Sequence, residues 1–329
     1  MVEKNILVTL EASVQARDVI GAAAAASADR IVSLDDVAAE MRGQALREAT
    51  VMLARNTAKE LRAGEADLLS NCKLIQFVTA GVDYIPLADL PAQVTIAANG
   101  GAYAEPMAEH ALAMTLAALK RLFVEHDKLR RLEFDQFRLN RMLAGACVGI
   151  LGFGGIGVAT ARLMRALGAK IHAINRSGQT SEVVDWIGRE DDLGLLLGQS
   201  DVVILSLPLT PSTHGLIGAK ELRAMKRDAI LVNLARGEIV DEAALYAHLV
   251  ANPEFTACID AWWVEPVRHG RFAMGHDFMN LANVIASPHN SASAKGWRDV
   301  ALQRAVANAC LALDGQSPRF IVPFGDRMM

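Results

Sequence analysis

Three polar side chains in the last third of the sequence, an arginine, a glutamate and a histidine, are of types that could bind an anion and transfer a proton. Arg236 lies in NLARGEIVDEAAL, Glu265 in DAWWVEP and His289 in SPHNSAS. A guanidinium stays charged and matches paired oxygens, and an imidazole can give or take a proton near neutral pH. Each stretch follows an apolar run, so each should emerge at the carboxyl edge of a parallel sheet, where ligands bind. We therefore expect the three side chains to converge.

The stretch GILGFGGIG, residues 149–157, carries glycines at Gly152, Gly154 and Gly157. It lies between an apolar run, ACVGIL, and an amphipathic helical pattern, VATARLMRAL, within a βαβ unit of about 30 residues. In that setting the first glycine permits a tight turn, the second lets the backbone approach a pyrophosphate, and the third lets the helix pack closely on the strand. The pattern predicts a dinucleotide site at a helix N-terminus. The alternative is a glycine-rich turn without a ligand.

The end of the next strand reads Asn175-Arg176-Ser177. An acidic residue there would bind the ribose 2′-hydroxyl of NAD, but asparagine occupies that place. Arg176 and Ser177 could bind a 2′-phosphate, so the sequence favours NADP over NAD. The alternative is that Arg176 is a solvated surface arginine and Asn175 serves NAD.

The elements that must position these residues alternate between strand and helix patterns, which predicts a doubly wound parallel α/β fold. Helices are expected at 105–132, 241–250 and 293–314. The expected strands are 5–10, 50–54, 73–78, 94–98, 146–151, 169–174, 201–208, 229–235, 255–261 and 283–289.

Several of these motifs, in this order, resemble the D-isomer-specific 2-hydroxyacid dehydrogenase family. The resemblance rests on TAGVDYI (79–85), MAEHALAMTLA (107–117), LAGACVGILGFGGIG, LPLTPSTHGLIG (207–218) and the three stretches around Arg236, Glu265 and His289. It implies a Rossmann cofactor domain, residues 100–290, inserted in a smaller flavodoxin-like α/β substrate domain, residues 1–99 plus 291–329. It also implies a homodimer.

The resemblance assigns a role to each of the three polar residues. Arg236 would bind the substrate carboxylate, polarise the 2-oxo group and stabilise the charge that develops on its oxygen. His289 would donate a proton to that oxygen in reduction and accept it in oxidation. Glu265 would hold the imidazole and favour its protonated form. Taken singly, these residues could instead be a salt-bridge arginine, a surface glutamate and a core histidine.

The resemblance also implies binding residues around the reacting groups. Ala80, Gly81 and Val82 would bind the substrate with Arg236 and His289, and Pro208, Ala235 and Asp260 would line the nicotinamide and its ribose. Asp260 could instead satisfy backbone donors at a strand end. The full set expected to bind the cofactor is Gly152, Gly154, Gly155, Ile156, Gly157, Asn175, Arg176, Ser177, Leu207, Pro208, Thr213, Leu234, Ala235, Arg236, Asp260 and His289.

The sequence departs from the family pattern at three places. Gly155 stands where many relatives carry a longer, often basic, side chain. Gly178 and Gln179 follow Ser177, where many NADP-using relatives place a second basic residue. Phe134 and Phe137 occupy a loop that often holds a tryptophan.

Composition excludes several other classes of protein. The 329 residues carry a net charge of −4, which gives no reason to expect a nucleic acid or an anionic membrane as partner. No apolar run is long enough to span a membrane, and the N-terminus, MVEKNILVTLEA, reads as a strand rather than a secretory signal. The four cysteines, Cys72, Cys147, Cys258 and Cys310, lack metal-ligand spacing, so we expect free thiols in a reducing cytoplasm and no metal.

The expected activity is reversible reduction of a 2-oxo acid to a D-2-hydroxy acid by NADPH or NADH. The Asn175-Arg176-Ser177 stretch resembles that of glyoxylate/hydroxypyruvate reductases, so glyoxylate and hydroxypyruvate are the leading substrates. The alternatives are a D-lactate-type or bulky 2-oxo acid dehydrogenase, a phosphite dehydrogenase, and a non-enzymatic, dinucleotide-sensing corepressor-like protein.

Overall fold

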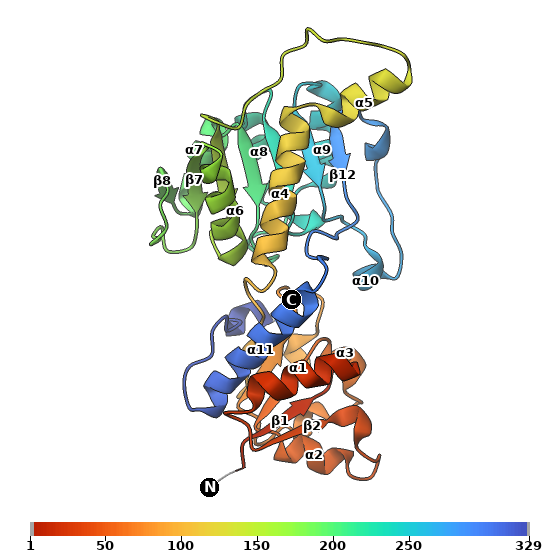
Figure 1. Cartoon of the computed structure of the whole chain (residues 1–329), viewed down its shortest axis with the longest axis vertical. Helices are drawn as coiled ribbons and strands as arrows, with labels where there is room; N and C mark the ends of the chain where they lie inside the picture. Colours follow the sequence, from red (N-terminus) through yellow and green to blue (C-terminus); the bar gives the residue numbers. More distant parts are fainter. Residues whose placement is uncertain (1–2, 328–329) are drawn as a thin grey trace. The chain divides into compact units, whose positions relative to one another are not determined.

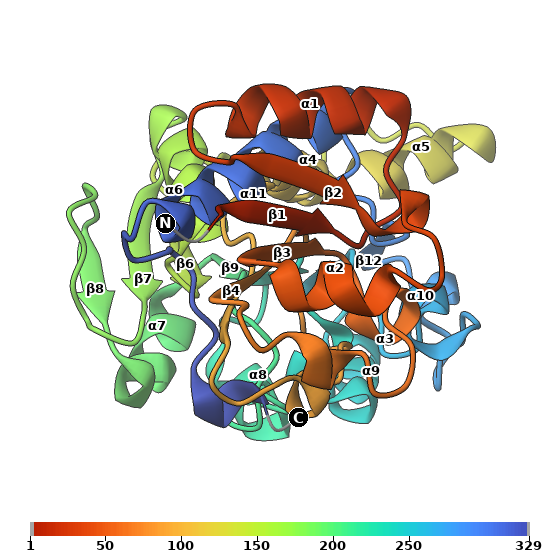
Figure 2. The same cartoon turned by 90° about the horizontal axis from the view of Figure 1, so that it is seen from below.

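The computed structural model describes residues 3–327, which form two compact units. One unit contains the chain up to Tyr103 together with the chain from Ala294 onward, and the other runs from Ala104 to Ser293. Each unit has one parallel β-sheet with helices on both faces (Figures 1 and 2). No helix in the described part of the chain is long and apolar enough to cross a membrane.

The first unit has a five-stranded sheet in the order β2-β1-β3-β4-β5. Its strands are β1 (Asn5–Val8), β2 (Arg30–Ser33), β3 (Val51–Ala54), β4 (Leu74–Phe77) and β5 (Thr95–Ala97). Its helices are α1 (Val14–Ala24), α2 (Arg42–Glu48), α3 (Thr57–Glu60) and α11 (Trp297–Leu313).

Strand residues in this unit alternate between two apolar cores. Ile6 and Val8 pack with residues of α1 and α11, while Leu7 between them packs with Leu46 of α2. This is the period of two that a strand imposes, and it places α1 and α11 on one face and α2 on the other (Figure 2).

The second unit has a seven-stranded parallel sheet in the order β12-β11-β10-β9-β6-β7-β8. Its strands are β6 (Cys147–Leu151), β7 (Lys170–Ile174), β8 (Trp186–Gly188), β9 (Val202–Leu205), β10 (Ile230–Asn233), β11 (Thr256–Ile259) and β12 (Val284–Ala286). Its helices are α4 (Ala104–Leu119), α5 (Leu122–Arg130), α6 (Gly155–Ala166), α7 (Leu193–Gln199), α8 (Ala219–Ala224), α9 (Glu242–Ala251) and α10 (Pro266–His269).

The strand order of this sheet reverses at β6. From β6 the chain runs outward to β7 and β8, then returns to place β9 on the other side of β6. Such a reversal leaves a crevice at the carboxyl ends of the two strands, where doubly wound folds bind ligands. The predicted doubly wound parallel α/β architecture is confirmed.

Two expected helices have different limits in the structure. The pattern at 105–132 predicted one helix, but α4 and α5 are separated at Arg121, whose φ of 55° is left-handed and cannot continue a helix. The C-terminal helix was expected from residue 293 and begins at Trp297, after Gly296 with a φ of 76°. The outermost ends of the predicted substrate domain, residues 1–2 and 328–329, lie outside the described residues.

Candidate active site

The glycine turn after β6 has the geometry that a dinucleotide needs. Gly152 has a φ of 90°, and a Cβ there would lie 2.6 Å from the backbone nitrogen of Leu207. A Cβ at Gly157 would collide with the carbonyl oxygen of Gly152 and lie 3.1 Å from Ile150 Cγ2, so glycine lets α6 approach β6. A Cβ at Gly154 would meet nothing within 4 Å, which leaves its backbone open to a ligand. The turn therefore fits a pyrophosphate.

Helix α6 begins within this turn, at Gly155, followed by Ile156 and Gly157. Gly154 is its N-cap, and no side chain caps the first N–H groups. The N-terminus of a 12-residue helix with uncapped N–H groups attracts anions through those groups and through its dipole. The lack of a basic side chain at Gly155 therefore leaves a backbone site for phosphate.

The turn that follows β7 is held together by the side chain of Asn175. Its Oδ1 accepts the N–H of Gly178 at 2.7 Å, and its Nδ2 donates to the carbonyl of Gln179 at 2.8 Å. Ser177 Oγ also donates to Asn175 Oδ1 at 3.1 Å. Asn175 thus shapes the turn that carries Arg176 and Ser177, and no carboxylate stands at its position.

The loop after β9 lies on the other side of the crevice. Leu207 faces Gly152 across the switch point, because a Cβ at Gly152 would lie only 2.6 Å from the Leu207 backbone nitrogen. Thr213 Oγ1 donates to the carbonyl of Pro208 and accepts the N–H of Thr210, both at 2.8 Å. The structure therefore brings Leu207 beside the glycine turn and fixes Pro208 through Thr213.

The loop after β10 presents Leu234, Ala235 and Arg236. Asn233, at the end of the strand, accepts the N–H of Ala235 at 3.0 Å and donates to the carbonyl of Arg236 at 2.8 Å. The Nη1 of Arg236 donates to the carbonyl of Ala235 at 2.7 Å. Both sides of Arg236's backbone are thus anchored in the loop at the carboxyl edge of the sheet.

His289 and Glu265 form a hydrogen-bonded pair at the same edge. The Nδ1 of His289 lies 2.8 Å from each carboxylate oxygen of Glu265. Because an ionised carboxylate only accepts, Nδ1 carries the proton of this bond. Nε2 is then the atom of His289 that can exchange a proton with another molecule.

Glu265 is buried and nevertheless held in its ionised form. Burial alone would raise its pKa, but the hydrogen bonds from His289 and the Trp262 N–H, together with the charges of His289 and Arg236, lower the pKa below its usual value. The Trp262 N–H donates to Glu265 Oε1 at 2.7 Å. The charge of Arg236 therefore acts on the same carboxylate that orients the histidine.

Asp260 organises the backbone around His289. It is fully buried, accepts the hydroxyl of Ser287 at 2.5 Å and the N–H of Asn290 at 3.1 Å, and its own carbonyl accepts the N–H of His289 at 2.9 Å. His289 has a φ of 49°, a left-handed conformation that costs energy for a non-glycine residue. Asp260 thus satisfies backbone donors at the strand end and stabilises the loop in this strained shape.

His110 of α4 completes this network and was not singled out from the sequence. Its Nε2 lies 3.0 Å from Ser287 Oγ, and since that hydroxyl donates to Asp260, the imidazole donates to the hydroxyl. His110 belongs to MAEHALAMTLA, a stretch quoted for the family resemblance without a role for this residue. Only its contact with a residue 177 positions away identifies it.

The predicted substrate-binding residues Ala80, Gly81 and Val82 belong to the first unit, where they follow β4. All three are partly exposed at the carboxyl edge of that sheet. No group of three or more His, Cys, Asp or Glu side chains within residues 3–327 could hold a metal ion.

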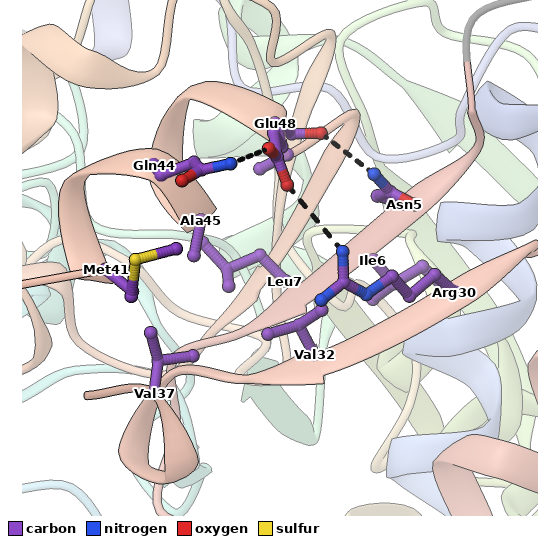
Figure 3. A pocket seen from close by; sticks show the side chains of 11 residues that line it. Asn5, Ile6, Leu7, Arg30, Val32, Val37, Met41, Gln44, Ala45 and Glu48 are labelled. Atoms are coloured by element: carbon purple, nitrogen blue, oxygen red, sulfur yellow. Dashed lines mark hydrogen bonds and ion pairs between the residues drawn. The ribbon is translucent and has the colours of Figure 1, made fainter.

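A pocket of about 160 Å³ lies elsewhere in the first unit (Figure 3). Its walls include Asn5 and Arg30, which begin β1 and β2, and Glu48, which ends α2. Glu48 lies 3.7 Å from Arg30 and accepts the Gln44 amide at 2.7 Å. The pocket is therefore at the amino-terminal edge of the sheet, opposite the edge that carries Ala80, Gly81 and Val82.

Comparison with known proteins agrees with this geometry. Residues 112–291 match the NAD binding domain of the D-isomer specific 2-hydroxyacid dehydrogenases. The chain is 32% identical over 256 residues to a glycerate dehydrogenase of Methylorubrum extorquens, covering 75% of this chain and 78% of that one. It is 30% identical over 286 residues to a glyoxylate reductase of Thermofilum pendens, covering 84% and 82%.

A crystal structure agrees as well. A D-isomer specific 2-hydroxyacid dehydrogenase from Xanthobacter autotrophicus Py2, in complex with NADPH and MES, superposes with a TM-score of 0.79 at 25% identity. The match covers 98% of this chain and 99% of that one. The expected family and cofactor class are thus confirmed, and the chain belongs to the D-isomer-specific 2-hydroxyacid dehydrogenase family, whose nicotinamide-dependent oxidoreductase activity it shares.

Proposed function

We propose that the protein reduces a short 2-oxo acid, glyoxylate or hydroxypyruvate, to the D-2-hydroxy acid with NADPH. The observation that carries the proposal is the pairing of His289 Nδ1 with both oxygens of buried Glu265, at the edge of the sheet that also carries the glycine turn. Relatives named glyoxylate reductase, hydroxypyruvate reductase and glycerate dehydrogenase support the substrate class.

The proposed chemistry uses three side chains. Arg236 binds the substrate carboxylate and the 2-oxo oxygen, where its charge offsets the negative charge that develops as the carbonyl is reduced. When bound, a reduced nicotinamide cofactor would supply the hydride that C2 accepts. His289 gives the proton on Nε2 to the oxygen, so that a C–H and an O–H bond form while the carbonyl π bond is lost. Glu265 stabilises the imidazolium before transfer and orients the ring.

Ala80, Gly81 and Val82 are proposed as further substrate-binding residues. Their backbone N–H groups would bind the substrate carboxylate, as the family resemblance implies. Under this proposal the substrate domain is formed by residues 1–99 and 291–329, and the cofactor domain by residues 100–290.

NADP is the proposed preferred cofactor. The turn after β7 has Asn175 in place of a carboxylate, followed by the exposed residues Arg176 and Ser177. An arginine and a hydroxyl suit a 2′-phosphate, and a carboxylate would repel one. The family neighbour from Xanthobacter autotrophicus was crystallised with NADPH.

A homodimer is proposed to form through α5 and the segment after it. Leu132, Phe134, Phe137 and Leu139 are each at least 77% exposed, which is unusual for large apolar side chains on a monomer. A second copy would bury them. Four free cysteines suit the reducing cytoplasm, the proposed compartment.

The test is the reduction of glyoxylate and hydroxypyruvate by the wild type and by the variants Arg236→Ala and His289→Ala. Loss of a general acid typically lowers kcat by about 10²–10⁴-fold. Unchanged turnover in both variants would refute the assignment of the site. Oxidation of phosphite instead, or dinucleotide binding with no turnover of any acid, would favour the phosphite dehydrogenase or corepressor-like alternatives.

A further inference from the structure

Arg189 lies beside the turn that carries Arg176 and Ser177, although the two segments are separated in sequence. β7 and β8 pair in parallel with Ile174 opposite Gly188, so the residues that follow them emerge together at the carboxyl edge. The N–H of Asn175 donates to the carbonyl of Gly188 at 3.2 Å, which extends this pairing by one step. Arg189 is the next residue along the chain.

The side chain of Arg189 folds onto this turn. Its Nε donates to the carbonyl of Ser177 at 3.2 Å. Gly178 has a φ of 66°, and a Cβ there would lie 2.9 Å from Arg189 Cγ and 3.1 Å from Nε. Glycine at 178 therefore both closes the turn and leaves room for the arginine. A basic side chain is absent at positions 178 and 179, but Arg189, which directly follows the next strand, lies beside this turn.

We propose that Arg189 binds the 2′-phosphate of NADP together with Arg176 and Ser177, an inference that rests on the NADP preference proposed above. The carbonyl of Ser177 uses only the Nε–H of Arg189, and the two terminal nitrogens carry four more N–H groups. A guanidinium anchored at Nε presents its terminal nitrogens to paired phosphate oxygens, and such charge-assisted bonds are the strong ones.

Three acidic residues follow Arg189 and set the size of the effect. Asp192 accepts the backbone N–H of Arg189 at 2.9 Å, and Glu190 and Asp191 are exposed neighbours. They oppose a phosphate and offset part of the attraction. Arg189 is itself exposed, so solvent screens its charge. We therefore expect Arg189 to contribute about tenfold to NADPH affinity, which corresponds to about 1.4 kcal/mol.

The experiment measures dissociation constants of the full-length protein for NADPH, NADH, 2′,5′-ADP and 5′-AMP by calorimetry, without substrate or turnover. Arg189→Ala should weaken NADPH and 2′,5′-ADP about tenfold and leave NADH and 5′-AMP within about twofold. Arg189→Lys, which keeps the charge and loses the fork, should lie between. The matched control is Arg223→Ala, an exposed arginine of α8, which should change none of the four values.

The outcomes separate this inference from the proposal beneath it. In one outcome the wild-type protein prefers NADPH, and Arg189→Ala either leaves the affinities for both dinucleotides unchanged or weakens them equally. That result overturns the role of Arg189 and leaves the NADP preference standing. Wild type that binds NADPH and NADH equally overturns both. A selective loss of the two ligands that carry a 2′-phosphate supports both.

Discussion

Replacing Glu265 by glutamine should lower the rate of 2-oxo acid reduction more than the ability to bind cofactor. The carboxylate lies 2.8 Å from His289 Nδ1 through both oxygens and is 7% exposed. Glutamine has nearly the same shape and can still accept a hydrogen bond, but it carries no charge to stabilise an imidazolium. The variant therefore tests the electrostatic role of Glu265 and keeps its packing.

The size of the effect follows from the type of bond. A hydrogen bond to a charged group contributes about 1.5–3 kcal/mol, and a tenfold change in rate corresponds to about 1.36 kcal/mol. Without the carboxylate, the imidazolium that donates the proton loses this stabilisation. We expect kcat for reduction to fall roughly ten- to hundredfold in Glu265→Gln. The dissociation constant for NADPH should change by less than about twofold.

The assay is kcat for 2-oxo acid reduction, followed by nicotinamide absorbance, together with the dissociation constant for NADPH measured by calorimetry. Glu254→Gln, an exposed carboxylate that contacts Arg138, is the matched control and should leave both values unchanged. A Glu265→Gln variant with the wild-type kcat would refute the reasoning, because the charge of the carboxylate would then not assist His289.

Other predictions follow from the close contacts and buried groups of both units. Gly157→Ala should cost about 1–3 kcal/mol of stability and weaken dinucleotide binding, because its Cβ meets the Gly152 carbonyl. The control Gly194→Ala places its Cβ in open space and should change neither stability nor binding. Thermal melts with and without cofactor measure both quantities. Burial raises the pKa of the Cys72 thiol to about 12, so alkylation at pH 8, mapped by mass spectrometry, should leave Cys72 unlabelled in the native protein. Burial would raise the pKa of Glu65, but the hydrogen bond and charge of Arg42 outweigh burial and lower it. This carboxylate therefore stabilises the fold above its unfolded pKa, and that stability is lost as pH falls through its folded pKa. Urea unfolding measures the effect, and an equally steep loss of stability in acid for a Glu65→Gln variant would contradict it.

The sequence predicts the central strands well but misses two of the edge strands. β6 and β9 are continuous apolar runs because both faces of a central strand are covered, and their limits differ from expectation by only a few residues. β2 and β8 are short edge strands with partly exposed residues, and no apolar run marks them. The break at Arg121 depends on a left-handed backbone in a residue type that gives no signal for it.

The same distinction holds for the candidate site. Arg236, Glu265 and His289 follow apolar strands and stand in recognisable motifs, so their placement at one edge could be expected. The contacts of His110 with Ser287 and of Arg189 with Ser177 join segments that no local pattern links. Helix packing in one case and strand pairing in the other create these contacts, and both are properties of the folded chain.

The most direct measurement is the steady-state reduction of glyoxylate, hydroxypyruvate, pyruvate and phenylpyruvate, each with NADPH and with NADH. The account predicts turnover of glyoxylate or hydroxypyruvate above the others, a preference for NADPH, and a D-configured product where the product is chiral. Turnover should be lost in His289→Ala. An NADH preference would contradict the assignment of Asn175, Arg176 and Ser177, and an absence of turnover with every acid would contradict the central claim.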